Sequence, residues 1–500
     1  MRRPNLAFLC QPAGAALLVS FLLLAVGLVR WHGGRRPNFP LEHSNVAYSL
    51  ATGAGYSNPF SVVSGPTAWV PPAVPLVDAG AIEFARALGI DERAPIVGIN
   101  IFAALAAVFL TLRFSLPYWA PSSRAVFCAG FLGYSVLDPD FLVSSGPLTA
   151  AESALLLAGL AAASRNPGGW RPWAMVLGAN ALLAITHPGL ELAGALASLV
   201  VGLPMALAGM RRPLALIRST SFAAFAGLAL GAGPWTIRNY IVFHQWIPAK
   251  SNGYFELVHS QDDSDTGVLT DAAIVGHPAT NPRLLREYVR LGERNFLEPY
   301  RRRANEILRN DFGRYCMFCF NRFIDAVWFG KALTDIEMLS VRLQPSQAAR
   351  LVGRRLILMC AGTPNFFWAR RDVPASTELA SLQAAGIDEP NAVLADWVRA
   401  QGIIRARMES LAATLTSFAW SGFPTLCSIA ALMVGRRLTP RLVPATAAIY
   451  LVALIPNILI THDMNHQGNF MLLFAVLAAG AVEAIFRRAG GPASPVNLGR

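Results

Sequence analysis

Charged side chains are scarce in this chain. Asp, Glu, Lys and Arg make up 14% of its 500 residues, whereas hydrophobic residues make up 54% and the mean hydropathy is +0.42. A soluble globular protein carries about 25% charged residues. With so little charge the chain cannot cover a fully water-exposed surface, so much of its area must face lipid. The composition therefore excludes a soluble enzyme and predicts a polytopic integral membrane protein.

Cysteine is also scarce. The six cysteines are scattered, and only Cys316 and Cys319 have the spacing of a metal or redox pair. They lie in the apolar run 315–320, and the chain holds no second pair of this spacing. A zinc site built on such a pair needs two more ligands. We therefore predict that both are small apolar residues at helical spacing.

Long apolar runs are abundant. Ten of them approach the ~20 residues that a helix needs to cross a bilayer, and the first reads as a retained signal anchor rather than a cleaved signal peptide. They occupy residues 13–29, 95–112, 125–143, 149–163, 173–185, 190–208, 214–235, 412–434, 442–460 and 470–486. The predicted fold is an all-α membrane protein with about ten transmembrane helices and two large extracytoplasmic segments.

The arginines give the orientation. Six short loops or ends carry clusters that fall on one side when ten spans are counted, and the positive-inside rule makes that side the cytoplasm. The clusters are Arg2 and Arg3; Arg113 and Arg124; Arg165 and Arg171; Arg211, Arg212 and Arg218; Arg436, Arg437 and Arg441; and Arg487 and Arg488. This distribution also explains the net charge of +12 without nucleic-acid binding, which would need a basic face on a soluble domain.

Ten predicted membrane spans divide the chain into four parts and place both termini in the cytoplasm. Residues 1–237 form an N-terminal membrane module whose first extracytoplasmic loop is 31–94, and 238–411 form a mainly helical extracytoplasmic segment. Residues 412–487 form the C-terminal membrane helices, and 488–500 form a cytoplasmic tail. The predicted location is the plasma membrane.

The first outer loop has a distinctive order of residues. Glu42 precedes a short helix-competent segment, 46–51, and a run rich in glycine and proline follows it. That run contains Gly53, Gly55, Ser57, Pro59 and Phe60, then Gly65-Pro66-Thr67-Ala68-Trp69, then Pro71, Pro72 and Pro75. Glycine and proline at this density fix turns, so we expect an ordered loop that holds an acid at the membrane face.

This string resembles bacterial membrane glycosyltransferases of the GT-C superfamily, close to family 39, which use dolichyl- or polyprenyl-phosphate sugars. The segment 233–240, Gly276-His277-Pro278 and Gly292-Glu293 follow in the order typical of that group. The resemblance covers about residues 1–330, and 412–487 by topology. It implies transfer of a sugar from a polyprenyl-phosphate carrier to an acceptor on the outer face, where a lipid, a glycan or a protein are all open. No cofactor is implied, and a divalent metal stays open.

On that resemblance Glu42 is the catalytic candidate, since a carboxylate can take the proton of an attacking hydroxyl. Capping of the following helix is its alternative. Asp140, beside Asp138, and Glu152 are further candidate acids near the second outer loop, with ordinary turn or intrahelical roles as alternatives. The chain's other proposed site residues are Arg238 and Arg322 for the lipid phosphate, and Trp69, His187 and His462 for the substrate cavity.

The last outer turn departs from the family pattern. His462 is kept, whereas Asn465, His466 and Gln467 replace a basic and aromatic run. The change removes positive charge from a place where a carrier phosphate could lie. Two other functions therefore stay open: a non-catalytic scaffold that binds the lipid carrier, and a transporter or flippase for a lipid-linked sugar. The large outer segments argue against a transporter, which typically has two related halves with short loops.

Overall fold

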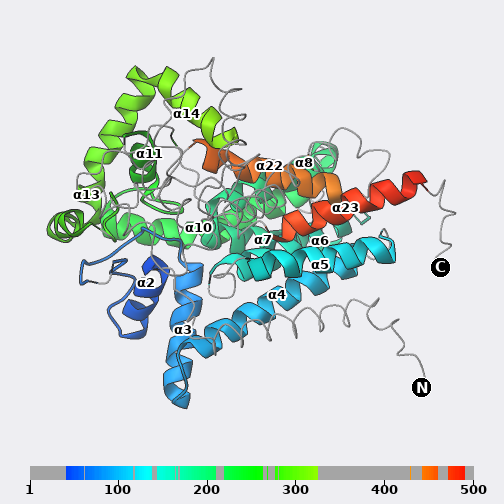
Figure 1. Cartoon of the computed structure of the whole chain (residues 1–500), viewed down its shortest axis with the longest axis horizontal. Helices are drawn as coiled ribbons and strands as arrows, with labels where there is room; N and C mark the ends of the chain where they lie inside the picture. The colour runs from blue at the N-terminus through cyan, green and yellow to red at the C-terminus, as the bar shows by residue number, and fades with distance from the viewer. Residues whose placement is uncertain are drawn as a thin grey trace, which may run out of the picture.

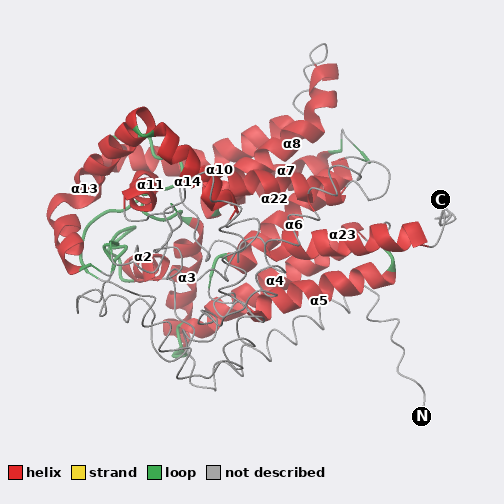
Figure 2. Ribbon diagram, turned by 45° about the horizontal axis from the view of Figure 1, so that its top comes forward, coloured by secondary structure: helices red, strands yellow, loops and turns green. Residues whose placement is uncertain are grey.

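The structure is a computed structural model in which every regular element of the described residues is an α-helix (Figure 2). An all-α fold is thus confirmed for this part of the chain. The only strand-like pairing within it is an isolated bridge between Ser57 and Pro66. The described residues are 41–60, 62–115, 119–137, 144–163, 165–166, 169–209, 219–262, 267, 276–279, 281–324, 428, 442–459 and 471–489.

Eight long apolar helices lie side by side and form one part of the molecule (Figure 1). They are α4 (Arg93–Ser115), α5 (Pro121–Leu137), α6 (Gly146–Ala163), α7 (Trp170–Thr186), α8 (Pro188–Gly209), α10 (Thr220–Phe243), α22 (Leu442–Leu459) and α23 (Met471–Ala489). They coincide with eight of the ten segments predicted to cross the membrane. The other two, 13–29 and almost all of 412–434, lie outside the described residues.

By length and hydropathy, two of the described helices are able to cross a membrane: Arg93–Phe114 and Gly146–Ala163. These two suggest membrane association, and the ten-span arrangement with cytoplasmic termini stays a prediction.

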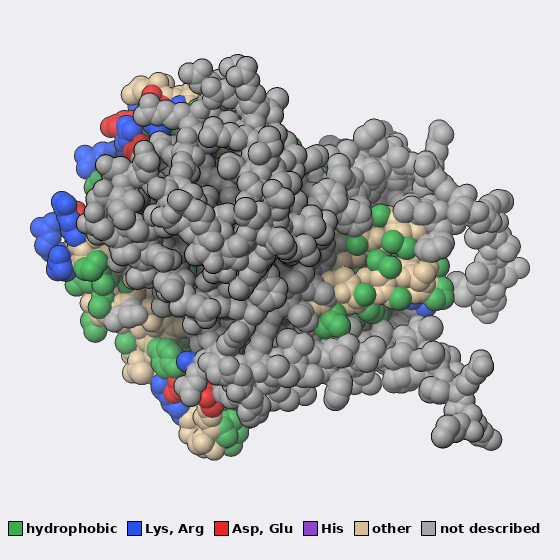
Figure 3. All heavy atoms as spheres, in the orientation of Figure 1, with side chains coloured by type: hydrophobic (Ala, Val, Ile, Leu, Met, Phe, Trp, Pro, Cys, Tyr) green, Lys and Arg blue, Asp and Glu red, His purple; other side chains and the backbone are tan. Residues whose placement is uncertain are grey.

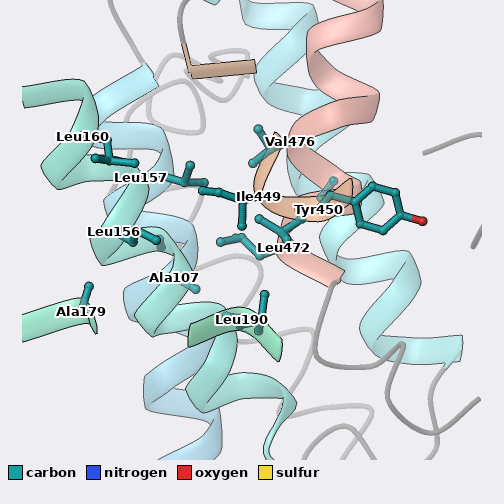
Figure 4. Close-up of a cluster of buried hydrophobic side chains, with 14 of the residues drawn as sticks. Ala107, Leu156, Leu157, Leu160, Ala179, Leu190, Ile449, Tyr450, Leu472 and Val476 are labelled. Atoms are coloured by element: carbon teal, nitrogen blue, oxygen red, sulfur yellow. The ribbon is translucent and has the colours of Figure 1, made fainter. Parts of the chain in front are cut away.

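The core of this helical part consists of aliphatic and aromatic side chains from all eight helices. Figure 4 shows part of this core, with Tyr450 at one edge. Small residues bring helices close together. A side chain at Gly227 or Gly231 of α10 would collide with the carbonyl oxygens of Leu177 and Ala181 on α7. The two glycines are one turn apart, so α10 presents a flat strip to α7, the packing typical of membrane helices.

The remaining helices gather at the other end of the molecule (Figure 1). They are α2 (Leu41–Ala51), α3 (Ala73–Leu88), α11 (Gly253–Asp262), α13 (Pro282–Asn310) and α14 (Phe312–Ile324). Asn281 caps α13 by accepting from the backbone amides of Arg283 and Leu284, and Pro282 starts the helix with a suitable φ. Within the predicted segment 238–411, the described residues contain the end of α10 and the helices α11, α13 and α14, and 325–411 lies outside the described residues.

The glycine- and proline-rich loop between α2 and α3 is ordered by its own hydrogen bonds, as its composition predicts. Asn58 has a φ of 59°, and its side-chain oxygen accepts from the amides of Ser64 and Gly65. Tyr56 donates its hydroxyl to the carbonyls of Val70 and Pro71. These bonds fix the position of the residues that reach the candidate site.

Candidate functional site

Glu42 lies in the first turn of α2, where a carboxylate is favoured by the helix dipole. Its Oε1 accepts a hydrogen bond from Trp69 Nε1 at 2.9 Å and lies 3.3 Å from His277 Nε2. Its Oε2 has no hydrogen-bond partner among the described residues, and a quarter (25%) of the side chain is exposed. One oxygen is thus held in place by two donors while the other stays available to a ligand.

The contacts of His277 indicate which of its two ring nitrogens carries the proton. The backbone amide of Ala279 donates to His277 Nδ1 at 3.2 Å. A neutral imidazole carries one donor and one acceptor, so Nε2 bears the proton and donates it to Glu42. The ring is held between Phe60, Trp69 and Phe255 at centroid distances of 5.7, 5.8 and 5.5 Å. His277 therefore orients Glu42 and has no free acceptor nitrogen with which to act as a base.

Two opposing effects set the pKa of Glu42. Burial is the largest single one and raises it, because it disfavours the charged form. The hydrogen bond that His277 donates is the largest of the effects that lower it. Together with smaller electrostatic contributions from His277, His43 and Lys250, this bond outweighs burial and leaves the pKa lowered from its usual value. The carboxylate is therefore ionised at neutral pH and able to accept a proton.

Trp69 was predicted to line the substrate cavity, and the structure places it against Glu42 with its ring in the protein interior. Its side chain is fully buried and packs edge-on against Phe60 and Tyr288, at 5.1 and 5.8 Å between centroids. A buried indole needs a partner for its N–H, and this one is Glu42. Trp69 thus holds the candidate acid in place rather than facing a ligand.

Glu293 is a second acid at the site, which the sequence did not single out as a functional residue. Its carboxylate is buried and accepts four hydrogen bonds, from Thr67 Oγ1 (2.5 Å), the Ala68 amide (2.8 Å), Ser251 Oγ (2.7 Å) and Tyr288 Oη (2.8 Å). Burial raises its pKa, and the hydrogen bonds oppose that rise. Glu293 joins the first outer loop to α13 and to the segment before α11.

Gly292 makes this contact geometrically feasible. It has φ 71° and ψ 160°, an extended conformation with positive φ that essentially only glycine adopts. This residue interrupts the helical geometry of α13 immediately before Glu293. The pair Gly292-Glu293 was a weak element of the family resemblance. Only the packing reveals that the glycine turns the acid inward onto Thr67 and Ala68.

Arg238 was predicted to bind the carrier phosphate. Its NH1 donates to Thr67 O and to Asn239 Oδ1, at 2.7 and 2.8 Å, and its NH2 donates to Tyr56 O at 3.0 Å. Its guanidinium also lies over the rings of Tyr56 and Trp235. These contacts fasten the first loop onto α10. Phosphate binding by this residue stays a prediction.

Arg322, the other predicted phosphate ligand, is fully buried at the end of α14. Five hydrogen bonds use the five N–H groups of its guanidinium. The acceptors are Ile458 O, Ser260 Oγ, Gly267 O, Cys319 Sγ and Leu459 O. A phosphate has no donor left to bind in this conformation, so we assign Arg322 to joining α14 to α11 and the end of α22. Cys319 serves here as a hydrogen-bond acceptor.

Glu152 and His187 lie together at the junction of α6, α7 and α8. Glu152 is buried; its Oε1 accepts from Thr186 Oγ1 at 2.8 Å, and its Oε2 has no hydrogen-bond partner among the described residues. His187, the next residue after Thr186, accepts the Leu190 amide at Nδ1. The contacts in the described residues do not connect this pair to Glu42.

The remaining predicted site residues fall outside the described residues. They are Asp138 and Asp140 of the second outer loop, and His462 of the last outer turn. Within the described part of the chain there is no group of three or more His, Cys, Asp or Glu side chains that could hold a metal ion.

Asp78 of α3 is a buried acid outside the proposed membrane spans, and it yields a test of the structure. It is 5% exposed, and burial raises its pKa to about 7. The folded protein then keeps a proton that the unfolded chain releases near pH ~4, so stability falls as the pH rises toward 7. Asp78→Asn cannot ionise. We expect its thermal midpoint to exceed that of the wild type by a margin that grows by several degrees between about pH 5 and pH 8. A margin independent of pH would contradict the assignment.

Comparison of the chain with protein-family models, with curated proteins and with solved structures finds no match. The functional argument below therefore rests on the residues and their geometry.

Proposed function

We propose that the protein is a membrane glycosyltransferase that moves a sugar from a polyprenyl-phosphate carrier to an acceptor hydroxyl on the extracytoplasmic face. The observation that carries the proposal is the carboxylate of Glu42. One of its oxygens is held by Trp69 and His277, while the other has no partner among the described residues. An ionised, oriented and partly exposed carboxylate is what a general base requires.

The reaction assigns each atom a destination. The acceptor hydroxyl gives its proton to Glu42 Oε2 as its oxygen attacks the anomeric carbon. The bond between that carbon and the phosphate oxygen breaks, and its electron pair leaves with the lipid phosphate. This leaving group is already anionic and needs positive charge rather than a proton. Lys250, whose charge lowers the pKa of Glu42, is paired with Glu256 at 2.7 Å.

The proposal includes the membrane arrangement. The ten apolar runs cross the bilayer, and α2, α3, α11, α13 and α14 lie outside it with Glu42. The basic loops between the helices α4 to α8 then face the cytoplasm in agreement with the positive-inside rule. Glu42 is thereby placed on the side where a lipid-linked sugar presents its headgroup.

The direct experiment uses membranes that contain the protein and a labelled polyprenyl-phosphate sugar. Transfer of the label to an acceptor supports the proposed enzyme. Movement of the intact labelled lipid across the bilayer points to a flippase, and binding without either points to a scaffold. Both of these outcomes contradict the proposal.

A variant of His277 tests how Glu42 is held. His277→Phe fits the aromatic surroundings but removes one of the two donors to Oε1 of Glu42. We expect the turnover number to fall by about tenfold, the value of one charge-assisted hydrogen bond. Because that bond lowers the pKa of Glu42, its loss should move the acid limb of the pH–rate profile to higher pH. His277→Gln, which keeps a donor, should restore part of both. An unchanged acid limb in His277→Phe would mean that the histidine only fills space.

A further inference from the structure

The first half of α13 carries a row of exposed arginines. Arg283, Arg286 and Arg290 are all exposed and are spaced three and four residues apart. This spacing puts them on one face of the helix. Basic side chains gather on the surface over α13 at the edge of the molecule (Figure 3). We refer to these three residues as the arginine row.

Among the described residues no ion pair involves the arginine row, although Glu287 lies within one turn of Arg283 and Arg290. In the second half of the same helix, two arginines are paired with carboxylates. Arg303 pairs with Asp262 at 2.8 Å and with Glu306 at 3.4 Å, and Arg301 lies 3.9 Å from Glu298. No such pair involves the row. Carboxylates thus engage Arg301 and Arg303, whereas the guanidinium groups of the row make no ion pair in the described residues and are available to a ligand.

The row is also unfavourable for the helix that carries it. Like charges three and four residues apart repel each other. Arg283 lies in the first turn, where the helix dipole disfavours a cation and where α13 has no acidic residue. A ligand with several negative charges would offset both effects. Arginine suits this role, because its planar fork binds carboxylate or phosphate in two places.

We propose that the arginine row binds a linear polyanion, an anionic glycan whose carboxylate or phosphate groups are spaced about 5 Å apart, as the arginines are along the helix axis. Binding of the polyanion to the arginine row does not depend on the proposed transferase activity. We further propose that the bound glycan is the acceptor of the sugar, and this step does rest on the proposed function.

The position of α13 favours a glycan over the anionic surface of a membrane. In Figure 1, α13 lies at the end of the molecule away from α5, α6 and α23. The segment 325–427 of the chain itself does not carry the excess of negative charge that would complement the arginine row, because its sequence has ten basic and nine acidic residues.

The row and the candidate site share one helical segment. Tyr288, between Arg286 and Arg290 in the sequence, is buried against Trp69, whose indole holds Glu42. A polymer bound to the arginine row therefore lies on the same helical segment that packs, through Tyr288, against the candidate site.

The test uses the purified full chain in nanodiscs of neutral phosphatidylcholine. Binding of labelled polygalacturonate is measured, with uncharged dextran as the reference. The triple variant R283Q/R286Q/R290Q is compared with R301Q/R302Q/R309Q, which removes three charges from the second half of the same helix. We expect the first to lose about tenfold or more in affinity, because three charge-assisted contacts disappear, and the second to lose much less. Added salt should weaken wild-type binding.

Equal losses in the two triple variants would mean diffuse attraction to net charge and would overturn the proposal. So would wild-type binding of polygalacturonate no tighter than that of dextran. Vesicles with phosphatidylglycerol distinguish the membrane alternative: if the row variant loses affinity for these vesicles and not for the polymer, the partner is a membrane. Should the triple variant fail to fold, the single variant R286Q must show a smaller loss in the same direction. A defect in sugar transfer with normal polymer binding would instead concern Glu42 and leave this inference standing.

Discussion

Replacing Glu42 by glutamine should lower sugar transfer by ~10²–10⁴-fold, the usual value of a positioned general base. Glu42→Gln keeps an oxygen that can accept from Trp69 and His277, so α2 and its surroundings should remain folded. It removes only the capacity of the second oxygen to take a proton. Initial rates of transfer per folded molecule, with carrier binding measured separately, give the result.

Two further variants make the test specific. Glu42→Asp should keep partial activity if the shorter side chain still reaches the acceptor. Glu83→Gln is the matched control, because Glu83 is an exposed acid on α3 and its change should leave transfer unaltered. A helix-capping role for Glu42 predicts instead that both Glu42 variants lose stability and that activity follows the amount of folded protein. Near-normal turnover in Glu42→Gln would move the chemistry to another acid, and Asp140 is the next to examine.

Replacing Glu293 should have the largest effect on stability. Glu293→Ala leaves the amide of Ala68 and three hydroxyl groups without their common acceptor. Each buried donor left unsatisfied costs ~1–3 kcal/mol. Part of this loss is recovered by rotation of the hydroxyls, so we expect unfolding to become easier by about 3–5 kcal/mol, the range for breaking a buried polar network.

The measurement is thermal or denaturant unfolding of the purified protein. Glu287→Ala is the matched control, since Glu287 lies on the same helix, is only partly buried and makes no hydrogen bond to the loop in the described residues. Glu293→Gln should be intermediate, because an amide oxygen can accept from some of the donors but its NH₂ group faces others. Equal stability of Glu293→Ala and Glu287→Ala would show that the first loop is held mainly by Arg238 and the aromatic contacts.

Predictions that depended only on residues close together in the sequence were correct for the helices and for the ordered first loop. The apolar runs predicted helices, and eight of them coincide with α-helices because length and hydropathy are local properties. The turn-forming residues after α2 predicted an ordered loop, and Asn58 and Tyr56 hold it by short-range hydrogen bonds. Glu42 could be selected as an acid ahead of this loop.

Predictions that depended on contacts between residues far apart in the sequence were less successful. Arg322 and Arg238 were assigned to a phosphate on the basis of charge and position. Charge alone does not reveal whether backbone carbonyls already surround a guanidinium, and here they do. Trp69 was assigned to a cavity because it is aromatic, but its burial depends on α11 and α13, which follow some 200 residues later.

The sequence by itself determined the helical class of the described part, the apolar segments and the position of an acid at the start of α2, because each depends on composition and on neighbours within a few turns. The tertiary structure alone decided that His277 and Trp69 meet on one oxygen of Glu42, that Glu293 gathers four donors, and that no carboxylate of the described residues pairs with the arginine row. These are matters of which distant surfaces come into contact. A hydrogen bond or an ion pair forms only within a few ångströms, and no local pattern specifies which segments will approach so closely.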